Sequence, residues 1–426
     1  MAKRSYRARV VDVELDELMR AVSVIALEGA KGVGKTATAS QRAKSVRELD
    51  DPGQRSIAVA DPARLLEGPP PILIDEWQYV PETWDLVRRA VDAGASPGRF
   101  LLTGSSRPVA AGSHSGAGRI LSLRMRPLAL SERGLSTPTV SLTDLLKGGG
   151  PKISGACPTS LEDYVGEIIS SGFPGLRSLS GRGLRGQLDG YLTRIVDRDF
   201  EELGHRLRDP ATLRRWLTAY AAASSTATSF EKIRDAATAG YGDKPAKSTT
   251  IPYRDVLERL WILDPVEAWS PSRNRLSRLS SPPKHQLADP ALAARLLGVD
   301  AETLLEGQTV GPPVPRDGTL LGALFESLVT LSVRTYAQSA EAVVKHLRTA
   351  GGQQEVDLIV ERADGRVVAI EVKLARDVGG DDTRHLHWLA ERIGDELLDA
   401  VIVTTGPEAY RRPDGIAVVP AALLGP

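Results

Sequence analysis

The stretch Gly29–Thr36, with the sequence GAKGVGKT, decides the fold of the first part of this 426-residue chain. It fits the eight-residue phosphate-loop pattern, which closes with Gly-Lys-Thr. The apolar segment Val22–Leu27 before it predicts a buried strand, and Ala37–Lys44 after it predicts a continuing helix. A strand, a glycine-rich loop and a helix in this order are the context in which the pattern forms a phosphate site.

The chemistry of a phosphate site explains these residue types. Glycine adopts backbone conformations that side chains forbid, so successive amides can point into one hollow, and the start of a helix adds its positive dipole end. Lys35 can reach the outer phosphates, and the Thr36 hydroxyl can hold Mg²⁺. The alternative is an ordinary glycine-rich turn, but the flanking segments favour binding of ATP or GTP. The predicted nucleotide-binding residues are Gly29, Ala30, Lys31, Gly32, Val33, Gly34, Lys35 and Thr36.

Length and composition set limits on the rest. The chain is too long for one ordinary core, so we expect two or three domains. Lys plus Arg equals Asp plus Glu at 54 each, so a nucleic-acid surface must be a local patch. The single cysteine, Cys157, excludes a disulfide within the chain and a zinc site with several thiolates; we expect it to be a small buried side chain.

The sequence predicts a cytoplasmic protein. Residues 1–9 are basic but lack the apolar stretch of a signal peptide. No apolar run approaches the roughly 18 residues that cross a membrane. We therefore expect no membrane partner.

A second motif follows at the end of the predicted strand Ile72–Ile74. Asp75 and Glu76 come directly after it. In the general phosphate-loop template a carboxylate here holds Mg²⁺ through water, so Asp75 has that predicted role. Glu76 can orient and deprotonate the attacking water. Two surface carboxylates are the alternative, which the upstream loop makes the weaker one.

Further strands are predicted at Arg55–Ala60, Arg99–Ser106 and Gly118–Leu123. Strand tips on the carboxyl edge of a parallel sheet face the ligand, so Thr103 either touches the terminal phosphate or attacking water, or lies in a plain turn. The predicted ATPase core spans residues 1–135. One nearby arginine could act as an arginine finger or all could be structural; the candidates are Arg107, Arg119, Arg124 and Arg126.

Residues 136–160 are rich in Gly, Ser, Thr and Pro and predict a linker. Residues 161–305 predict a helical and winged-helix-like region, in which a basic segment either meets DNA or belongs to a helical subdomain that packs on the ATPase. The helices are expected at Leu188–Leu203, Thr212–Ala223, Ser229–Ala239 and Ser248–Leu260, and the basic residues are Arg273, Arg275, Arg278 and Lys284.

The last module, residues 319–426, predicts a small α/β unit. A leading helix is expected at Thr319–Tyr336 and a hairpin of two strands at Gln354–Glu361 and Val367–Lys373. A helix at residues 382–393 and a strand at Ala400–Thr405 complete it.

Carboxylates of this module form a second candidate site. Asp357 lies on the first hairpin strand, and Glu371 and Lys373 share one face of the second because they are two residues apart. Asp357, Glu371 and Glu326 could hold Mg²⁺ or Mn²⁺, with Lys373 steadying a water or the developing phosphate charge. A salt-bridged hairpin is equally compatible with the pattern.

Taken in order, these motifs resemble a family of bacterial and archaeal AAA-type ATPases with a C-terminal domain of unknown function (DUF4143-like) that is similar to PD-(D/E)xK nucleases. The resemblance covers nearly the whole chain. Its quoted stretches are Leu27–Thr36, Ile74–Gln78, Leu101–Ser106, Gly118-Arg119, Arg126–Leu128, Ser171–Pro174, Tyr191-Leu192, Asp197–Asp199, Leu324–Glu326, Glu355–Asp357 and Glu371–Lys373.

The resemblance implies a five-stranded parallel sheet, ATP hydrolysis with Mg²⁺ and assembly into a homo-oligomer. For the last module it implies a restriction-endonuclease-like fold with Glu326, Asp357 and Glu371 as metal ligands and Lys373 as a catalytic group. Here Val356, rather than a proline, precedes the first carboxylate.

Two functions follow. The first is an ATP-hydrolysing protein that acts on or near nucleic acid, with metal-dependent nuclease activity in the last module. The alternative is a nucleotide-controlled switch or scaffold that binds a protein partner, with a catalytically inert nuclease-like fold.

Overall fold

The computed structural model describes residues 6–105, 117–205, 207, 209–238, 247–271, 282–306 and 320–426. The chain forms two compact units, and each is described by itself. Unit 1 comprises Met1–Arg126, Phe173–Gly175 and Val256–Ile262, and unit 2 comprises Pro127–Gly172, Leu176–Asp255 and Leu263–Pro426.

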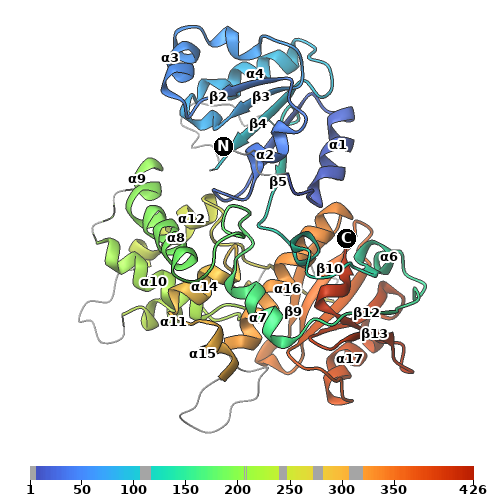
Figure 1. Ribbon diagram of the computed structural model, residues 1–426. Coiled ribbons are helices and arrows are strands. Elements are labelled where there is room, and N and C mark those ends of the chain that lie inside the picture. Colours follow the sequence, from blue (N-terminus) through green and yellow to red (C-terminus); the bar gives the residue numbers. More distant parts are fainter. Residues whose placement is uncertain are drawn as a thin grey trace. The chain divides into compact units, whose positions relative to one another are not determined.

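Unit 1 contains the predicted five-stranded parallel sheet, with strand order β2-β3-β4-β1-β5 (Figure 1). Strand β4 lies between β1 and β3, with Leu27 beside Thr103 and Ile74 beside Leu102. The carboxyl ends of these three strands therefore meet at one edge of the sheet. The strands are β1 (Val24–Glu28), β2 (Ser45–Glu48), β3 (Ile72–Asp75), β4 (Phe100–Gly104) and β5 (Leu121–Arg124).

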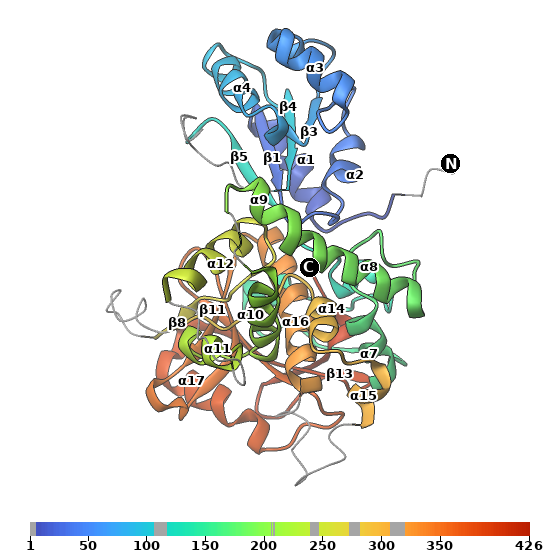
Figure 2. The same ribbon diagram turned by 90° about the vertical axis from the view of Figure 1, so that its left-hand side faces the viewer.

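Helices cover both faces of this sheet (Figures 1 and 2). On one face, α3 and α4 pack over a buried core in which the Trp77 and Trp84 ring centroids are 4.9 Å apart. On the other face, α1 and α2 contact β1. Short 3₁₀ segments follow α3 and β3. The bounds are α1 (Val11–Ala21), α2 (Lys35–Ser40), α3 (Pro52–Ala60), α4 (Glu82–Asp92), and 3₁₀ turns at Pro62–Leu66 and Trp77–Tyr79.

The predicted strand at Arg55–Ala60 is wrong, because this segment belongs to helix α3. The Asp51 side chain accepts a hydrogen bond from the Gln54 amide at 2.8 Å, and Pro52 occupies the first turn. A capping carboxylate followed by proline is a helix-start signal that outweighs the β-branched residues after it. The second strand is instead β2, an edge strand with alternating half-buried and exposed residues.

Unit 2 is built on an eight-stranded mixed sheet of order β7-β13-β14-β12-β11-β10-β9-β8. The predicted hairpin is present as the antiparallel pair β10–β11, and β11 pairs in parallel with β12. Helix α17 packs on one face through Leu386 and Leu389. The strands are β7 (Gly155–Ala156), β8 (Ala268–Trp269), β9 (Val343–Arg348), β10 (Glu355–Glu361), β11 (Val367–Lys373), β12 (Leu397–Thr404), β13 (Glu408–Arg411) and β14 (Ala417–Pro420).

Five helices of unit 2, α5, α6, α7, α14 and α15, contact the long helix α16, which also contacts strands β9 to β11. Figure 2 shows α10, α14 and α16 close together. The helices with residues in unit 2 are α5 (Leu130–Arg133), α6 (Leu142–Lys147), α7 (Leu161–Ile169), α8 (Gly181–Arg194), a π segment (Ile195–Asp199), α9 (Phe200–Glu202), α10 (Pro210–Ala222), α11 (Phe230–Ala236), α12 (Lys247–Arg259), α14 (Pro290–Leu296), α15 (Ala301–Glu306), α16 (Leu320–Ser339) and α17 (Arg384–Ile393).

The segment 136–160 differs from the predicted linker. Strand β6 (Val140–Ser141) pairs with β15 (Leu424–Gly425) near the end of the chain, and β7 pairs with β13. Leu142, Leu145 and Leu146 of α6 are buried. The Gly and Pro residues therefore mark turns around short elements, and residues 136–160 belong to the same compact unit as the last module.

Asp289 organises the start of α14. Its carboxylate accepts hydrogen bonds from the Ala291 amide (2.8 Å), the Gly172 amide (2.5 Å) and the Ser171 hydroxyl (3.0 Å). Asp289 is fully buried, and Ser171 has a left-handed backbone (φ 64°). This cap explains part of the Ser171–Pro174 motif in structural terms.

The predicted basic wing is described only in part, because Arg273, Arg275 and Arg278 lie outside the described residues. Isolated bridges join Leu263 to Leu287 and Val266 to Lys284 across this region. Lys284, predicted to face DNA, is 1% exposed and points into unit 2. None of the helices described is long and apolar enough to cross a bilayer.

Candidate functional site

Three glycines shape the loop between β1 and α2. Gly29 has φ 151°, and a Cβ added there would lie 2.2 Å from the Met125 carbonyl oxygen. Gly32 and Gly34 have φ values of 82° and 101°, in the left-handed region that side chains rarely adopt. Glycine is thus required at position 29 because the Met125 carbonyl packs closely against it. Gly32 and Gly34 let the backbone turn into α2.

Lys35 lies in the first turn of α2 and is only 5% exposed. Its ammonium donates to the carbonyl oxygens of Gly29 (2.8 Å) and Ala30 (3.0 Å). Burial lowers the pKa of Lys35 to about 8, against the opposing charges of Glu76 and Asp75. The ammonium is therefore held inside the curve of the loop, which is the position that a phosphate-binding lysine needs.

Asp75 receives two hydroxyl hydrogen bonds on the same oxygen. The Thr36 hydroxyl donates to Asp75 Oδ1 at 2.7 Å, and the Thr103 hydroxyl donates to the same atom. Asp75 is 6% exposed and Thr103 is fully buried. Thr103 thus contacts Asp75 from strand β4 and orients that carboxylate, and its predicted contact with the terminal phosphate or attacking water stays a prediction.

Thr36 and Asp75 fit a magnesium–nucleotide complex. A hydroxyl and a carboxylate in contact, beside a loop rich in backbone amides, are the oxygen donors that Mg²⁺ takes next to substrate phosphates. The prediction of these two residues as a pair is consistent with their 2.7 Å contact.

Glu76 has a left-handed backbone with φ 52°. Its Oε2 accepts hydrogen bonds from the Gln78 amide nitrogen and from the Ser105 hydroxyl (3.2 Å). Left-handed backbones of residues other than glycine are uncommon, and they gather at functional sites. The Glu76 carboxylate is thereby held beside Asp75 at the same sheet edge.

Arg9 is a residue of this site that the motifs did not indicate. Its guanidinium donates to the Val33 carbonyl (2.8 Å) and to the Arg126 carbonyl (2.8 Å). Arg9 is 7% exposed. Arg9 thus joins the phosphate loop to the segment that follows β5. The one sequence signal that could have indicated this role is its position in a basic N-terminal segment.

The predicted finger arginines have structural contacts where they are described. The Arg119 guanidinium pairs with Asp92 at 3.0 Å, and Arg124 lies 4.2 Å from the centroid of the Trp261 ring. Arg107 and Ser106 lie outside the described residues. Arg126 offers its carbonyl to Arg9.

The second candidate site lies in unit 2, and its centre is Lys284. The Lys284 ammonium is 2.8 Å from Glu326 Oε1, 3.0 Å from Asp357 Oδ1 and 3.5 Å from Glu355 Oε1. These carboxylates raise the pKa of Lys284 against the effect of burial. Glu326 and Asp357 are thus brought together as predicted, but around a lysine.

The other two residues of the predicted set pair with each other. Lys373 Nζ is 3.3 Å from Glu371 Oε1. Burial, followed by the charge of Asp357, raises the pKa of Glu371 well above its usual value, and burial raises the pKa of Glu326 to about 8. The cluster therefore favours protonated or lysine-paired carboxylates.

These residues do not fit a bound divalent metal. Lys284 takes the position between Glu326 and Asp357 that a metal ion needs. Within the described ranges, no three His, Cys, Asp or Glu side chains are arranged to hold a metal. The predicted metal ligands Glu326, Asp357 and Glu371 thus form an ion-pair cluster with the two lysines.

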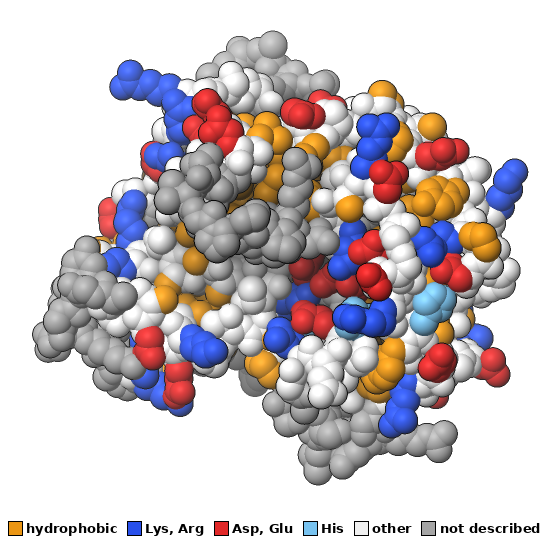
Figure 3. Space-filling model, turned by 90° about the horizontal axis from the view of Figure 1, so that it is seen from below, with side chains coloured by type: hydrophobic (Ala, Val, Ile, Leu, Met, Phe, Trp, Pro, Cys, Tyr) orange, Lys and Arg blue, Asp and Glu red, His pale blue; other side chains and the backbone are white. Residues whose placement is uncertain are grey.

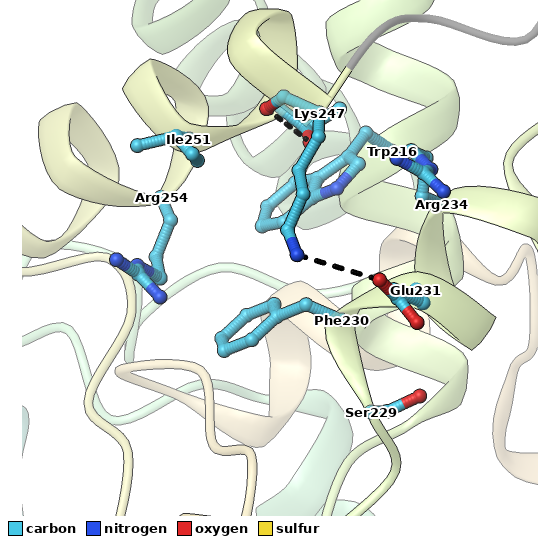
Figure 4. Close-up of a pocket in the computed structure, with 9 residues that line it drawn as sticks. Trp216, Ser229, Phe230, Glu231, Arg234, Lys247, Ile251 and Arg254 are labelled. Carbon is cyan, nitrogen blue, oxygen red and sulfur yellow. Dashed lines mark hydrogen bonds and ion pairs between the residues drawn. The ribbon is translucent and has the colours of Figure 1, made fainter.

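A separate pocket of about 330 Å³ lies among α10, α11 and α12 (Figure 4). Trp216 and Phe230 supply its aromatic surface, and Arg254 lies 5.1 Å from the Phe230 centroid. Lys247 pairs with Glu231 at 3.4 Å. One acidic and one basic side chain of the pocket thus neutralise each other.

Figure 3 shows one face of the molecule, on which acidic and basic side chains of the described residues are interspersed. A patch of one sign, which nucleic-acid binding would favour, is not evident among the described residues of this face. This agrees with the equal numbers of acidic and basic residues in the chain.

Three segments of the chain match known families. Residues 22–133 match the AAA domain family, residues 161–303 match a domain of unknown function (DUF8612), and residues 321–424 match a domain of unknown function (DUF4143). The chain thus carries an AAA domain and a C-terminal DUF4143 domain, and the AAA domain supports ATP binding. The family descriptions name no nuclease, so that part of the resemblance stays a prediction.

Similar proteins include two from mycobacteria and one of known structure. Uncharacterized proteins of Mycobacterium bovis and Mycobacterium tuberculosis are each 26% identical over 406 residues, covering 93% of this chain and 80% of theirs. A solved structure, described as a Walker-type ATPase of Pyrococcus abyssi, is 16% identical with a TM-score of 0.39, covering 67% of this chain and 94% of that one.

Proposed function

We propose that unit 1 binds ATP with Mg²⁺ and hydrolyses it. The observation that carries this proposal is the 2.7 Å contact between the Thr36 hydroxyl and Asp75, which joins the two halves of the site without a ligand. A magnesium ion bound with ATP supplies charge neutralisation at the phosphates. Thr36 and Asp75 would hold it.

The other side chains have distinct parts in this proposal. Lys35 exchanges its two carbonyl partners for outer phosphate oxygens, which are stronger acceptors because they are charged. Glu76 accepts a proton from the attacking water, and Gln78 and Ser105 keep its carboxylate in place. Thr103 orients Asp75 through its hydroxyl.

Phosphate release from ATP with Mg²⁺ tests the proposal in wild type, Lys35→Ala and Glu76→Gln. Lys35→Ala should lose both binding and turnover because the phosphate-facing ammonium is gone. Glu76→Gln should retain ATP binding and lose most turnover, since the amide cannot accept the proton. Equal rates in all three proteins would contradict the proposal.

We further propose that hydrolysis is coupled to a macromolecular partner and that the chain assembles into a homo-oligomer, as the resemblance implies. DNA is the partner of the leading hypothesis. Phosphate release measured with and without double-stranded DNA tests it, and at least a severalfold stimulation is expected. No stimulation at low salt, where nucleic-acid binding is strongest, would favour the switch or scaffold that binds a protein.

A further inference from the structure

The carboxylate cluster of unit 2 already contains a cation. The Lys284 ammonium has three N–H donors, and three carboxylates surround it, those of Glu326 on α16 and of Glu355 and Asp357 on β10. Only 1% of the Lys284 side chain is exposed. The ammonium thus donates hydrogen bonds to Glu326 and Asp357 inside the protein and has Glu355 as a third ion-pair partner.

The backbone fixes Lys284 in this position. Its amide donates to the Val266 carbonyl at 2.8 Å, and the Val266 amide donates to the Lys284 carbonyl at 2.9 Å. The neighbouring His285 is also anchored, because its amide donates to the Thr226 carbonyl at 2.8 Å. These backbone hydrogen bonds hold Lys284 and His285 in place. A small backbone movement therefore cannot take the Lys284 side chain out of the cluster.

Most of the oxygen atoms that a metal would use are already engaged, and Glu371 Oε2 is the buried one that has no hydrogen-bond partner among the described residues. Asp357 Oδ1 faces Lys284, and Asp357 Oδ2 accepts the Val372 amide at 2.9 Å. Glu355 has a second cation, Arg348, at 3.4 Å, and Glu371 has Lys373. A divalent cation placed among these carboxylates would meet the repulsion of the enclosed ammonium.

We propose that Lys284 replaces the divalent metal of a nuclease-like site, so that the DUF4143 domain of this chain is a non-cutting scaffold. The cluster ties Lys284 to α16 and β10. The inference does not depend on the nucleotide chemistry of unit 1. It predicts that removing the ammonium creates a metal site.

Binding of Mn²⁺ to the nucleotide-free full chain tests the proposal, with free Mn²⁺ followed by electron paramagnetic resonance. Wild type and Asp357→Asn should give the same titration, because wild type has no site there to lose. Lys284→Met should gain one bound Mn²⁺ and a melting temperature that rises with Mn²⁺, and adding Asp357→Asn should abolish both gains.

Lys345→Met is the matched control, since Lys345 is a lysine of the same sheet that pairs with the single carboxylate Glu361. It should gain no Mn²⁺ site. A Mn²⁺ site in wild type that Asp357→Asn lacks, or Asp357-dependent cleavage of plasmid DNA with Mn²⁺, would overturn the proposal. This wild-type comparison decides the question even if Lys284→Met fails to fold.

Discussion

Replacement of Thr103 by valine gives the sharpest test of how the nucleotide site is built. Valine has nearly the same shape, so the change removes one hydroxyl from a fully buried position. That hydroxyl donates to Asp75 Oδ1, the same oxygen that Thr36 contacts. Without it, we expect Asp75 to lose its fixed orientation toward Thr36.

The size of the effect follows from the kind of bond that is lost. A hydrogen bond to a charged group contributes about 1.5–3 kcal/mol. At 1.36 kcal/mol per factor of ten, the loss corresponds to a fall of about 10-fold to about 150-fold in Mg²⁺-dependent turnover. Because Thr103 acts through Asp75, we expect the concentration of Mg²⁺ needed for half-maximal rate to rise as well.

The assay is phosphate release from ATP over a series of Mg²⁺ concentrations. Thr103→Ser keeps the hydroxyl and should restore most of the rate. Thr83→Val is the control, because Thr83 is 1% exposed and its buried hydroxyl has no hydrogen-bond partner. It removes a hydroxyl from the same unit and should leave turnover unchanged.

The reasoning would be refuted by a Thr103→Val protein that is folded and turns over ATP at the wild-type rate. A slower protein whose Mg²⁺ dependence is unchanged would also count against the orienting role of Thr103. That second result would instead favour direct contact with the phosphate or water.

Three further predictions concern binding and stability. Burial lowers the pKa of Lys35 to about 8, so its charge is lost as pH rises through that value. The Kd for ATP should therefore increase about tenfold between pH 7 and pH 9 in a binding titration. Asp289→Ala should reduce the free energy of unfolding by about 3 kcal/mol in urea denaturation, since it removes a helix cap and leaves buried donors unpaired, whereas Asp289→Asn should cost less. Gly29→Ala should abolish ATP binding and lower the melting temperature because its Cβ would meet the Met125 carbonyl, whereas Gly190→Ala in α8, with open space around it, should do neither.

The parts of the fold that could be predicted are those in which one local signal decides. The loop at Gly29–Thr36 and the carboxylates after β3 are local patterns, and the parallel sheet that joins them is confirmed. The error at α3 was also local, because the Asp51-Pro52 cap was available in the sequence and was outweighed by apolar residues. Edge strand β2 was missed because its alternation covers only four residues.

The contacts that could not be predicted join residues far apart in the chain. Thr103 meets Asp75 only because β4 lies between β1 and β3, and a strand order is not written in any single motif. Arg9 reaches Val33 and the end of β5 in the same way.

Lys284 shows why a correct set of residues can still give the wrong chemistry. The spacing of Asp357, Glu371 and Lys373 was sufficient to place them together, but it could not reveal a cation supplied from a segment more than seventy residues earlier. In the sequence Lys284 stands next to serines and prolines and resembles a surface lysine. Carboxylates stabilise the buried Lys284 ammonium, and that cation in turn stabilises carboxylates that lie so close together. The lysine and the carboxylates of the cluster therefore stabilise each other. A sequence motif that contains only the carboxylates does not determine whether their cation is a metal ion or a lysine.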